Sequence, residues 1–263
     1  MTILERIIAD KRVEVASAKS AMPLKELEKS PLYTAERPSF RLNIGRPGPS
    51  IIAEFKRKSP SKGFINATAK PDVIVPGYQA AGAAAISVLT DRYFSGSLDD
   101  LVTAFSCSGL PLLRKDFVID EYQVFEARAS GASAILLIAT AMGQDELNRI
   151  SSRALSLELD VLFEIHSEAD LQKCPKNISI IGVNNRNLET FAVNTDVSIQ
   201  LLKQIPDSCL KVSESGLGDP GTIASLLRAG FDAFLVGETF MRSPDPGKQA
   251  HRFIRDINAI KPV

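Results

Sequence analysis

The chain has 263 residues, 44% of them hydrophobic, and lysine plus arginine balance aspartate plus glutamate at 31 each. This length and composition suffice for one domain with a substantial core, and the zero formal charge provides no net field that would attract nucleic acid or an anionic membrane. No stretch approaches the roughly 20 apolar residues that span a bilayer, and the charged N-terminus differs from a secretory signal. We therefore expect a cytoplasmic protein that binds neither nucleic acid nor membrane.

The cysteine and histidine content argues against disulfides and metal sites. Cys107, Cys174 and Cys209 are odd in number and form no Cys-x-x-Cys pair, so we interpret all three as free thiols. His166 and His251 are far apart in the sequence, and we interpret each as a surface or packing residue rather than a metal ligand. Catalysis is then expected to depend on lysines and carboxylates.

Two helices are predicted before the main fold. Apolar residues from Ile3 to Val15 recur at helical spacing among charged ones, and Pro23 begins a second short helix. Prolines and glycines then indicate a loop that leads into the first strand. We expect residues 1–49 to form a helical extension over the barrel, within a single domain of residues 1–263.

Short apolar runs then alternate with amphipathic helical stretches. Runs this apolar suit parallel strands that are covered by helices on both faces. Eight such units predict a closed (β/α)8 TIM barrel, with an open doubly wound sheet as the alternative. The predicted strands are residues 50–55, 84–89, 110–114, 134–138, 160–163, 179–183, 210–213 and 232–236.

Polar residues stand at the carboxyl ends of several predicted strands, the face on which barrel enzymes place their active sites. Each of these residues alone could equally form a structural ion pair or a cap. Together they favour an active site, because barrel closure would bring them to one mouth. The six residues are Glu54, Lys56, Lys115, Glu164, Asn184 and Glu214.

Small residues follow the last two predicted strands. Ser215 and Gly216 follow the seventh strand and Gly237 follows the eighth, where barrels commonly hold a phosphate through backbone amides. Residues 59–63 are a further candidate for phosphate contact or for a mobile loop over the mouth. We therefore expect a phosphorylated small-molecule substrate, although these glycines could merely permit tight turns. No Gly-x-Gly-x-x-Gly motif follows a strand, which argues against a Rossmann-type nucleotide cofactor.

These segments together resemble the indole-3-glycerol-phosphate synthase family. The run IAEFKRKSPSKG from Ile52 to Gly63 resembles the family's first-strand signature, and residues 3–12 resemble its opening helix. The likeness therefore covers essentially the whole chain. Five further stretches resemble the family in the same order, and they begin at Ala84, Leu113, Gly182, Ser213 and Leu235.

The resemblance implies a carbon–carbon lyase of tryptophan biosynthesis that needs neither cofactor nor metal. The family reaction converts 1-(2-carboxyphenylamino)-1-deoxyribulose 5-phosphate into indole-3-glycerol phosphate with loss of carbon dioxide and water. Attack of the aromatic carbon on the ketone places negative charge on the ketone oxygen and positive charge on the anilino nitrogen. A lysine and a carboxylate can balance these two charges.

The same resemblance assigns catalytic roles. Lys115 is expected to protonate the ketone oxygen as general acid, and Glu164 to oppose the iminium charge and help in proton transfer. Lys56 would hold the substrate carboxylate and protonate the leaving hydroxyl, and Glu54 would orient the sugar and assist dehydration. The division of work between the two lysines stays open. The polar positions around the ribulose chain and the ring nitrogen are Asn184, Glu214 and Ser215.

Substrate-binding positions follow from the resemblance as well. The expected phosphate contacts are Arg186, Ser59, Gly216, Gly237 and Glu238. The expected apolar slot for the anthranilate ring consists of Phe94, Phe117 and Leu188. From the sequence alone, these three residues could equally be plain core.

Two other functions stay open at this point. Phosphoribosylanthranilate isomerase uses a similar barrel, but it needs a cysteine and an aspartate at strand ends, where none of the three cysteines stands with a partner. A catalytically silent phosphate-binding barrel would be expected to lose part of the lysine and glutamate set, all of which is present. We expect a monomer or weak oligomer, and a separate partner enzyme of the pathway stays open.

Overall fold

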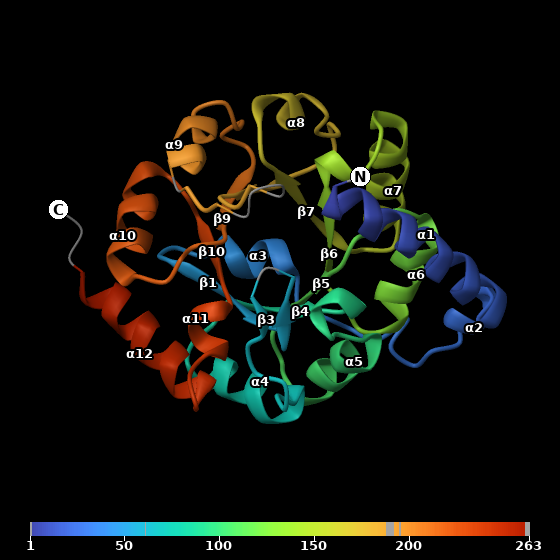
Figure 1. The fold of residues 1–263 in the computed structure, drawn as a ribbon, viewed down its shortest axis with the longest axis horizontal. Helices are drawn as coiled ribbons and strands as arrows, with labels where there is room; N and C mark the ends of the chain where they lie inside the picture. Colours follow the sequence, from blue (N-terminus) through green and yellow to red (C-terminus); the bar gives the residue numbers. More distant parts are fainter. Residues whose placement is uncertain (1, 61, 188–191, 195, 261–263) are drawn as a thin grey trace.

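Eight parallel strands form a closed barrel at the centre of the molecule (Figure 1). The computed structural model describes residues 2–60, 62–187, 192–194 and 196–260. The barrel strands are β1 (Ser50–Phe55), β4 (Ala85–Leu89), β5 (Leu112–Lys115), β6 (Ala134–Ile138), β7 (Asp160–Ile165), β8 (Ile180–Asn184), β9 (Leu210–Glu214) and β10 (Ala233–Val236). Strand β1 closes the ring by pairing with both β4 and β10.

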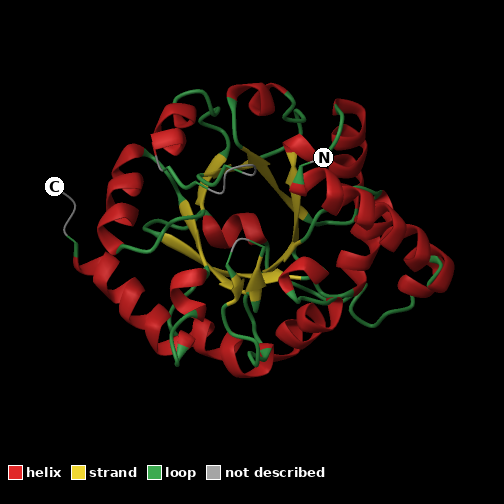
Figure 2. Ribbon diagram, in the orientation of Figure 1, coloured by secondary structure: helices red, strands yellow, loops and turns green. Residues whose placement is uncertain are grey.

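The predicted TIM barrel is confirmed, and each observed strand begins and ends within two residues of its predicted run. Helices form a ring outside the strands (Figure 2). The closed order of the strands excludes the open doubly wound sheet. The outer helices are α4 (Pro71–Ala80), α5 (Leu98–Cys107), α6 (Glu121–Ala129), α7 (Gln144–Ser156), α8 (Glu168–Gln172), α9 (Asp196–Leu202), α10 (Pro220–Ala229) and α12 (Pro246–Ala259).

Alternation along each strand separates two apolar clusters. On β1, Ile51, Ala53 and Phe55 belong to the large cluster between strands and helices, whereas Ile52 belongs to the cluster inside the barrel. Successive strand residues point to opposite faces, so Glu54 shares the inward face with Ile52. The same alternation directs the last inward residue of several other strands into the barrel mouth.

The first helix, α1 (Ile3–Ala21), lies at this mouth. Thr2 caps the N-terminus of this helix. Its hydroxyl accepts from the backbone N–H of Glu5, while the Glu5 carboxylate accepts from the backbone N–H of Thr2. This reciprocal capping satisfies two N–H groups that would otherwise lack partners. Three of its apolar residues, Ile3, Leu4 and Ile7, line the cavity described below. The short helix α2 (Leu24–Leu27) follows and packs near α6.

A third helix, α3 (Phe40–Ile44), closes the opposite end of the barrel, in a segment for which we predicted a loop. Phe40 and Ile44 are fully buried against the inward residues at the beginnings of the strands. Asp160 at the start of β7 accepts from the backbone N–H of Arg41 at 2.9 Å. Residues 2–49 therefore contact both ends of the barrel, because their apolar side chains are divided between mouth and base.

Short elements complete the mouth. Strands β2 (Lys58–Ser59) and β3 (Gly63–Phe64) form an antiparallel hairpin after β1, where the sequence suggested a mobile loop. The remaining short elements are η1 (Arg92–Phe94), η2 (Ala139–Ala141) and α11 (Glu238–Met241). Within the described residues, no helix combines the length and apolar character needed to cross a membrane.

Candidate active site

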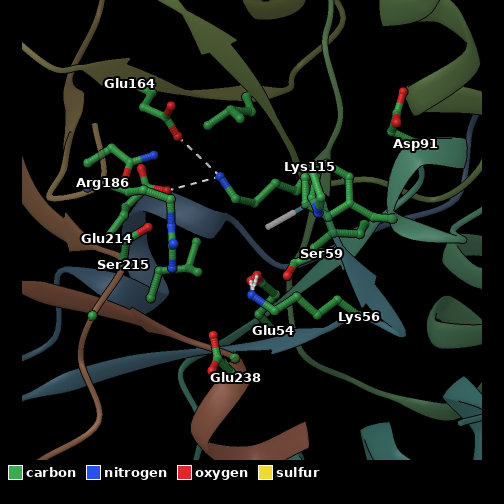
Figure 3. A pocket seen from close by; sticks show the side chains of 18 of the residues that line it. Glu54, Lys56, Ser59, Asp91, Lys115, Glu164, Arg186, Glu214, Ser215 and Glu238 are labelled. Atoms are coloured by element: carbon green, nitrogen blue, oxygen red, sulfur yellow. Dashed lines mark hydrogen bonds and ion pairs between the residues drawn. The ribbon is translucent and has the colours of Figure 1, made fainter. Parts of the chain in front are cut away.

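A cavity of about 480 Å³ opens at the carboxyl ends of the barrel strands. Figure 3 shows lysine and glutamate side chains that point into it from strands far apart in the sequence. All seven residues predicted to be catalytic line this cavity: Glu54, Lys56, Lys115, Glu164, Asn184, Glu214 and Ser215. The mouth therefore brings together the charged set that the strand ends predicted.

Lys115 bridges two carboxylates across the cavity. Its Nζ donates to Oε2 of Glu164 at 3.2 Å and to Oε2 of Glu214 at 3.0 Å (Figure 3). Burial disfavours the ammonium, but Glu214 and Glu164 raise the pKa of Lys115 above its ordinary value. The lysine is thus held protonated, which is the form that a general acid requires before proton transfer.

The two carboxylates that share Lys115 differ in their pKa. Burial raises the pKa of Glu214 to about 7, and the negative charge of Glu164 adds to this effect. Burial also opposes ionisation of Glu164, but Lys115, His166 and Asn184 together lower its pKa. Oε1 of Glu214 is also buried without a hydrogen-bond partner among the described residues. Glu164 is therefore the ionised member of the pair near neutral pH, and Glu214 readily accepts a proton.

A second lysine–glutamate pair lies on the β1 side. Nζ of Lys56 donates to both carboxylate oxygens of Glu54, at 3.2 and 3.1 Å. The glycine that follows the neighbouring strand β10 makes room for this carboxylate, because a Cβ at Gly237 would lie 2.8 Å from Glu54. Similarly, a Cβ at Gly182 on β8 would lie 2.3 Å from Oε1 of Glu214. Both glycines allow a buried carboxylate to lie against the adjacent backbone.

The residues predicted to bind phosphate include a tight backbone turn and a glutamate whose side chain pairs with cations. Ser215 and Gly216 have φ angles of 69° and 76°, a left-handed conformation that glycine adopts without strain. Glu238 begins α11, and its carboxylate contacts Lys62 at 2.6 Å and Arg242 at 2.8 Å. The negative side chain is thus paired with two cations. The predicted contacts that line the cavity are Ser59, Arg186, Gly216, Gly237 and Glu238.

An apolar wall faces these charges. Phe94 from η1 and Phe117 after β5 both line the cavity, with ring centroids 6.5 Å apart and planes inclined by 33°. Leu188, the third predicted member of the slot, lies outside the described residues. Sequence reasoning missed Leu136 and Ile138 of β6, which also line the cavity. Both residues are apolar, as ordinary barrel core residues are. Only their inward position near the end of the strand could have indicated that they line the site.

Lys11 of α1 fastens this helix to the mouth, a role that its place among charged helix residues did not indicate. The side chain is 1% exposed. Its Nζ lies 2.7 Å from Oδ2 of Asp91 after β4 and 2.9 Å from Oδ1 of Asp116 after β5. Arg114 reaches the other oxygen of Asp116 at 3.0 Å. The lysine therefore ties α1 to the segments that precede Phe94 and Phe117.

The histidines and cysteines take no part in the cavity lining. His251 on α12 is exposed, whereas His166 follows β7 and is partly buried, with Nε2 3.5 Å from Oε1 of Glu164. The three cysteines are free thiols, and none lines the cavity. Among the described residues, no group of three His, Cys, Asp or Glu side chains is placed to hold a metal ion. The cavity thus offers lysines, carboxylates and backbone amides for chemistry.

Known proteins show the same fold and a closely related sequence. Tryptophan synthase subunit alpha from Legionella pneumophila superposes with a TM-score of 0.59 at 12% identity, covering 80% of this chain and 93% of that chain. For 3-hexulose-6-phosphate synthase from Salmonella typhimurium the TM-score is 0.61 at 11% identity, covering 80% and 98%. These likenesses concern the fold alone.

Sequence comparison is more specific. An indole-3-glycerol phosphate synthase from Bacteroides thetaiotaomicron is 45% identical over 97% of this chain and 98% of its own length. One from Polaromonas sp. (strain JS666) is 44% identical over 93% and 95%. The family model for indole-3-glycerol phosphate synthase matches residues 4–253. The lysine–glutamate mouth thus stands in a chain that, along nearly its whole length, belongs to the indole-3-glycerol phosphate synthase family of carboxy-lyases.

Proposed function

We propose that the cavity binds 1-(2-carboxyphenylamino)-1-deoxyribulose 5-phosphate and converts it into indole-3-glycerol phosphate between Lys115 and Glu164. The observation that carries this proposal is the bridge from Lys115 to Glu164 and Glu214, opposite the Glu54–Lys56 pair in the same cavity. The ammonium of Lys115 and the carboxylate of Glu164 thus face the same small cavity, and ring closure uses both charges.

Ring closure uses the two charges as follows. The aromatic carbon that carries the carboxylate attacks the ketone carbon, and the electrons of the carbonyl double bond move to its oxygen, which Lys115 protonates. The nitrogen lone pair supplies the electrons, so an iminium forms, and Glu164 stabilises its positive charge. Carbon dioxide then leaves, and its bonding electrons neutralise the iminium and restore the aromatic ring.

Dehydration follows at the second pair. The former ketone oxygen is now a hydroxyl group, and Lys56 protonates it so that it leaves as water. The adjacent methylene carbon loses a proton to the Glu54 carboxylate, which completes the pyrrole ring. Glu54 holds Lys56 in place at 3.1 Å and orients the sugar. In the preceding steps, the same lysine would hold the substrate carboxylate.

The remaining contacts fix the two ends of the substrate. Phosphate binding is assigned to Ser59, Arg186 and the backbone amides at Gly216, Gly237 and Glu238. The pairing of the Glu238 carboxylate with Lys62 and Arg242 supports this assignment, because it lowers the repulsion that a phosphate would meet. Phe94 and Phe117 would enclose the anthranilate ring and keep water from the reacting atoms.

Indole fluorescence provides a direct test, since the chain contains no tryptophan. The synthetic ribulotide is mixed with the protein, and product formation is followed with Lys115→Ala as the paired variant. We expect steady indole formation by the parent chain and at least a hundredfold slower rate in the variant. An equal rate in Lys115→Ala would refute the assigned acid. If the parent forms no indole but isomerises phosphoribosylanthranilate, or only binds phosphorylated ligands, the alternative functions hold.

Assembly and location are part of the same proposal. Each residue assigned a role above stands in one chain, and those described line one cavity, so a single copy suffices for catalysis and a monomer or weak oligomer is our expectation. A cytoplasmic location stays a prediction from the sequence.

A further inference from the structure

The imidazole of His166 contacts Glu164 but does not line the cavity. His166 directly follows β7, two positions after Glu164. Its Nε2 is 3.5 Å from Oε1 of Glu164, whereas the other carboxylate oxygen accepts from Lys115. The described residues that line the cavity include Glu164 but not His166. Contact with the substrate therefore belongs to the carboxylate and not to the imidazole.

The imidazole has no other polar task that accounts for its position. Both ring nitrogens are buried, and neither makes a hydrogen bond with any residue that the structure describes. A buried N–H without an acceptor is costly, and an apolar side chain would fill this space without that cost. The acidic partner within ion-pair distance is Glu164. The benefit that offsets this cost is therefore expected from the contact between the imidazole and the Glu164 carboxylate.

We propose that His166 is a positioning residue for ring closure, whose Nε2–H donates to Oε1 of Glu164 and keeps the carboxylate directed at the anilino nitrogen. A small rotation of either side chain turns the 3.5 Å approach into an aligned hydrogen bond. A hydrogen bond to this oxygen suits the task, because it fixes the direction of the carboxylate that faces the iminium. With Lys115 on one oxygen and His166 on the other, the carboxylate is fixed at both ends. This inference rests on the role proposed above for Glu164.

Three substitutions separate this role from packing. The amide nitrogen of glutamine reaches the place of Nε2, whereas that of asparagine reaches only the place of Nδ1. We therefore expect His166→Gln to keep kcat within about twofold, and both His166→Asn and His166→Ala to lower kcat roughly tenfold with KM little changed. His251→Gln on the exposed face of α12 is the matched control and should leave both constants unchanged.

A double-substitution cycle shows whether the effect passes through Glu164. If it does, Glu164→Gln/His166→Ala is no slower than Glu164→Gln alone. A full tenfold loss on top of Glu164→Gln would overturn the proposal, as would an unchanged kcat in His166→Ala or an equal loss in His166→Gln. If His166→Ala does not fold, the folded His166→Asn and His166→Gln variants decide by the same comparison. Should Glu164→Gln itself keep the parental rate, the proposed function of Glu164 fails, which is a distinct outcome.

Discussion

Two buried lysine clusters lie at the mouth, one around Lys11 and one around Lys115, and they differ in the exposure of the lysine. Lys11 is 1% exposed, and Asp91 and Asp116 each have a cation within 3.0 Å. Lys115 is 15% exposed and opens on the cavity. Lys11 does not line the cavity, whereas Lys115 opens on the space that a substrate would fill. The contrast suggests that the Lys11 cluster holds the fold and the Lys115 cluster does the chemistry.

The largest effect is expected from Lys115→Met. Loss of the general acid should lower kcat by about 10²–10⁴-fold, while the free energy of unfolding changes little. The remaining carboxylates can share a proton beside an open cavity, so they are not left as two unpaired charges. Single-turnover rates and urea unfolding of the same preparation measure both quantities. A variant that loses stability as strongly as it loses rate would remove the distinction between the clusters.

The opposite pattern is expected from Lys11→Met. This change leaves Asp91 and Asp116 buried with one cation fewer, and breaking such a buried network costs about 3–5 kcal/mol of unfolding free energy. At a temperature well below the transition, kcat should stay within tenfold of the parent, because Lys11 is not among the residues that line the cavity. Lys11→Arg, which keeps the charge, should recover most of the stability. A hundredfold loss of kcat in folded Lys11→Met would make this cluster part of the catalytic machinery.

Two carboxyls, Glu214 beside Lys115 and Asp116 beside Lys11, should give pH dependences of opposite sign. Burial raises the pKa of Glu214 to about 7 in the folded chain, so the folded state binds this proton more tightly than the unfolded state does. Its contribution is full below about pH 4.5 and is lost as the pH rises through 7, by up to about 3 kcal/mol. Asp116 behaves in the reverse manner. Burial opposes its ionisation, but Arg114 and Lys11 lower its pKa to about 2, so its contribution is lost as the pH falls from 3.8 through 2.

Urea unfolding measured at several pH values tests both pH dependences. The quantity compared is the difference in free energy of unfolding between the parent and each variant. The parent should lose stability relative to Glu214→Gln between pH 4.5 and 7, and relative to Asp116→Asn it should lose stability below pH 3.8. Parallel curves for the parent and Glu214→Gln would show that the Glu164–Glu214 pair holds no extra proton near neutrality.

The sequence predicted the barrel and most of the mouth because both depend on short-range patterns. Continuous apolar runs mark strands that are covered on both faces, and the residue that ends each run must face one end of a closed barrel. Glu54 and Glu164 could thus be assigned to the mouth before any contact was known. The α3 helix was missed, since prolines and glycines flank its five residues and indicated a loop. Only its contact with the inside of the barrel explains it.

Long-range partners account for what the sequence could not reveal. Lys11 looked like a solvated residue of an amphipathic helix, and its two aspartates stand 80 and 105 positions further along the chain. His166 looked like an ordinary packing residue, because nothing in the sequence indicates that its nitrogens lack hydrogen bonds. In both cases a polar side chain on a predictable element acquires its role from a neighbour that the chain brings close only on folding.

The smallest expected effect concerns the apolar wall that faces both clusters. Phe117→Leu keeps an apolar side chain but removes the ring that lies 6.5 Å from that of Phe94. An aromatic pair contributes about 0.5–1.5 kcal/mol beyond its buried area. Because the Phe117 ring would form such a pair with the anthranilate ring of the bound substrate, its loss should raise KM by roughly 2- to 12-fold while kcat stays close to the parental value. Phe125→Leu on α6 is the matched control, because that ring lies against Arg153 and not at the cavity. If Phe117→Leu instead lowered kcat with KM unchanged, the ring would act on the geometry of Lys115 two positions earlier, and the wall would belong to the catalytic cluster.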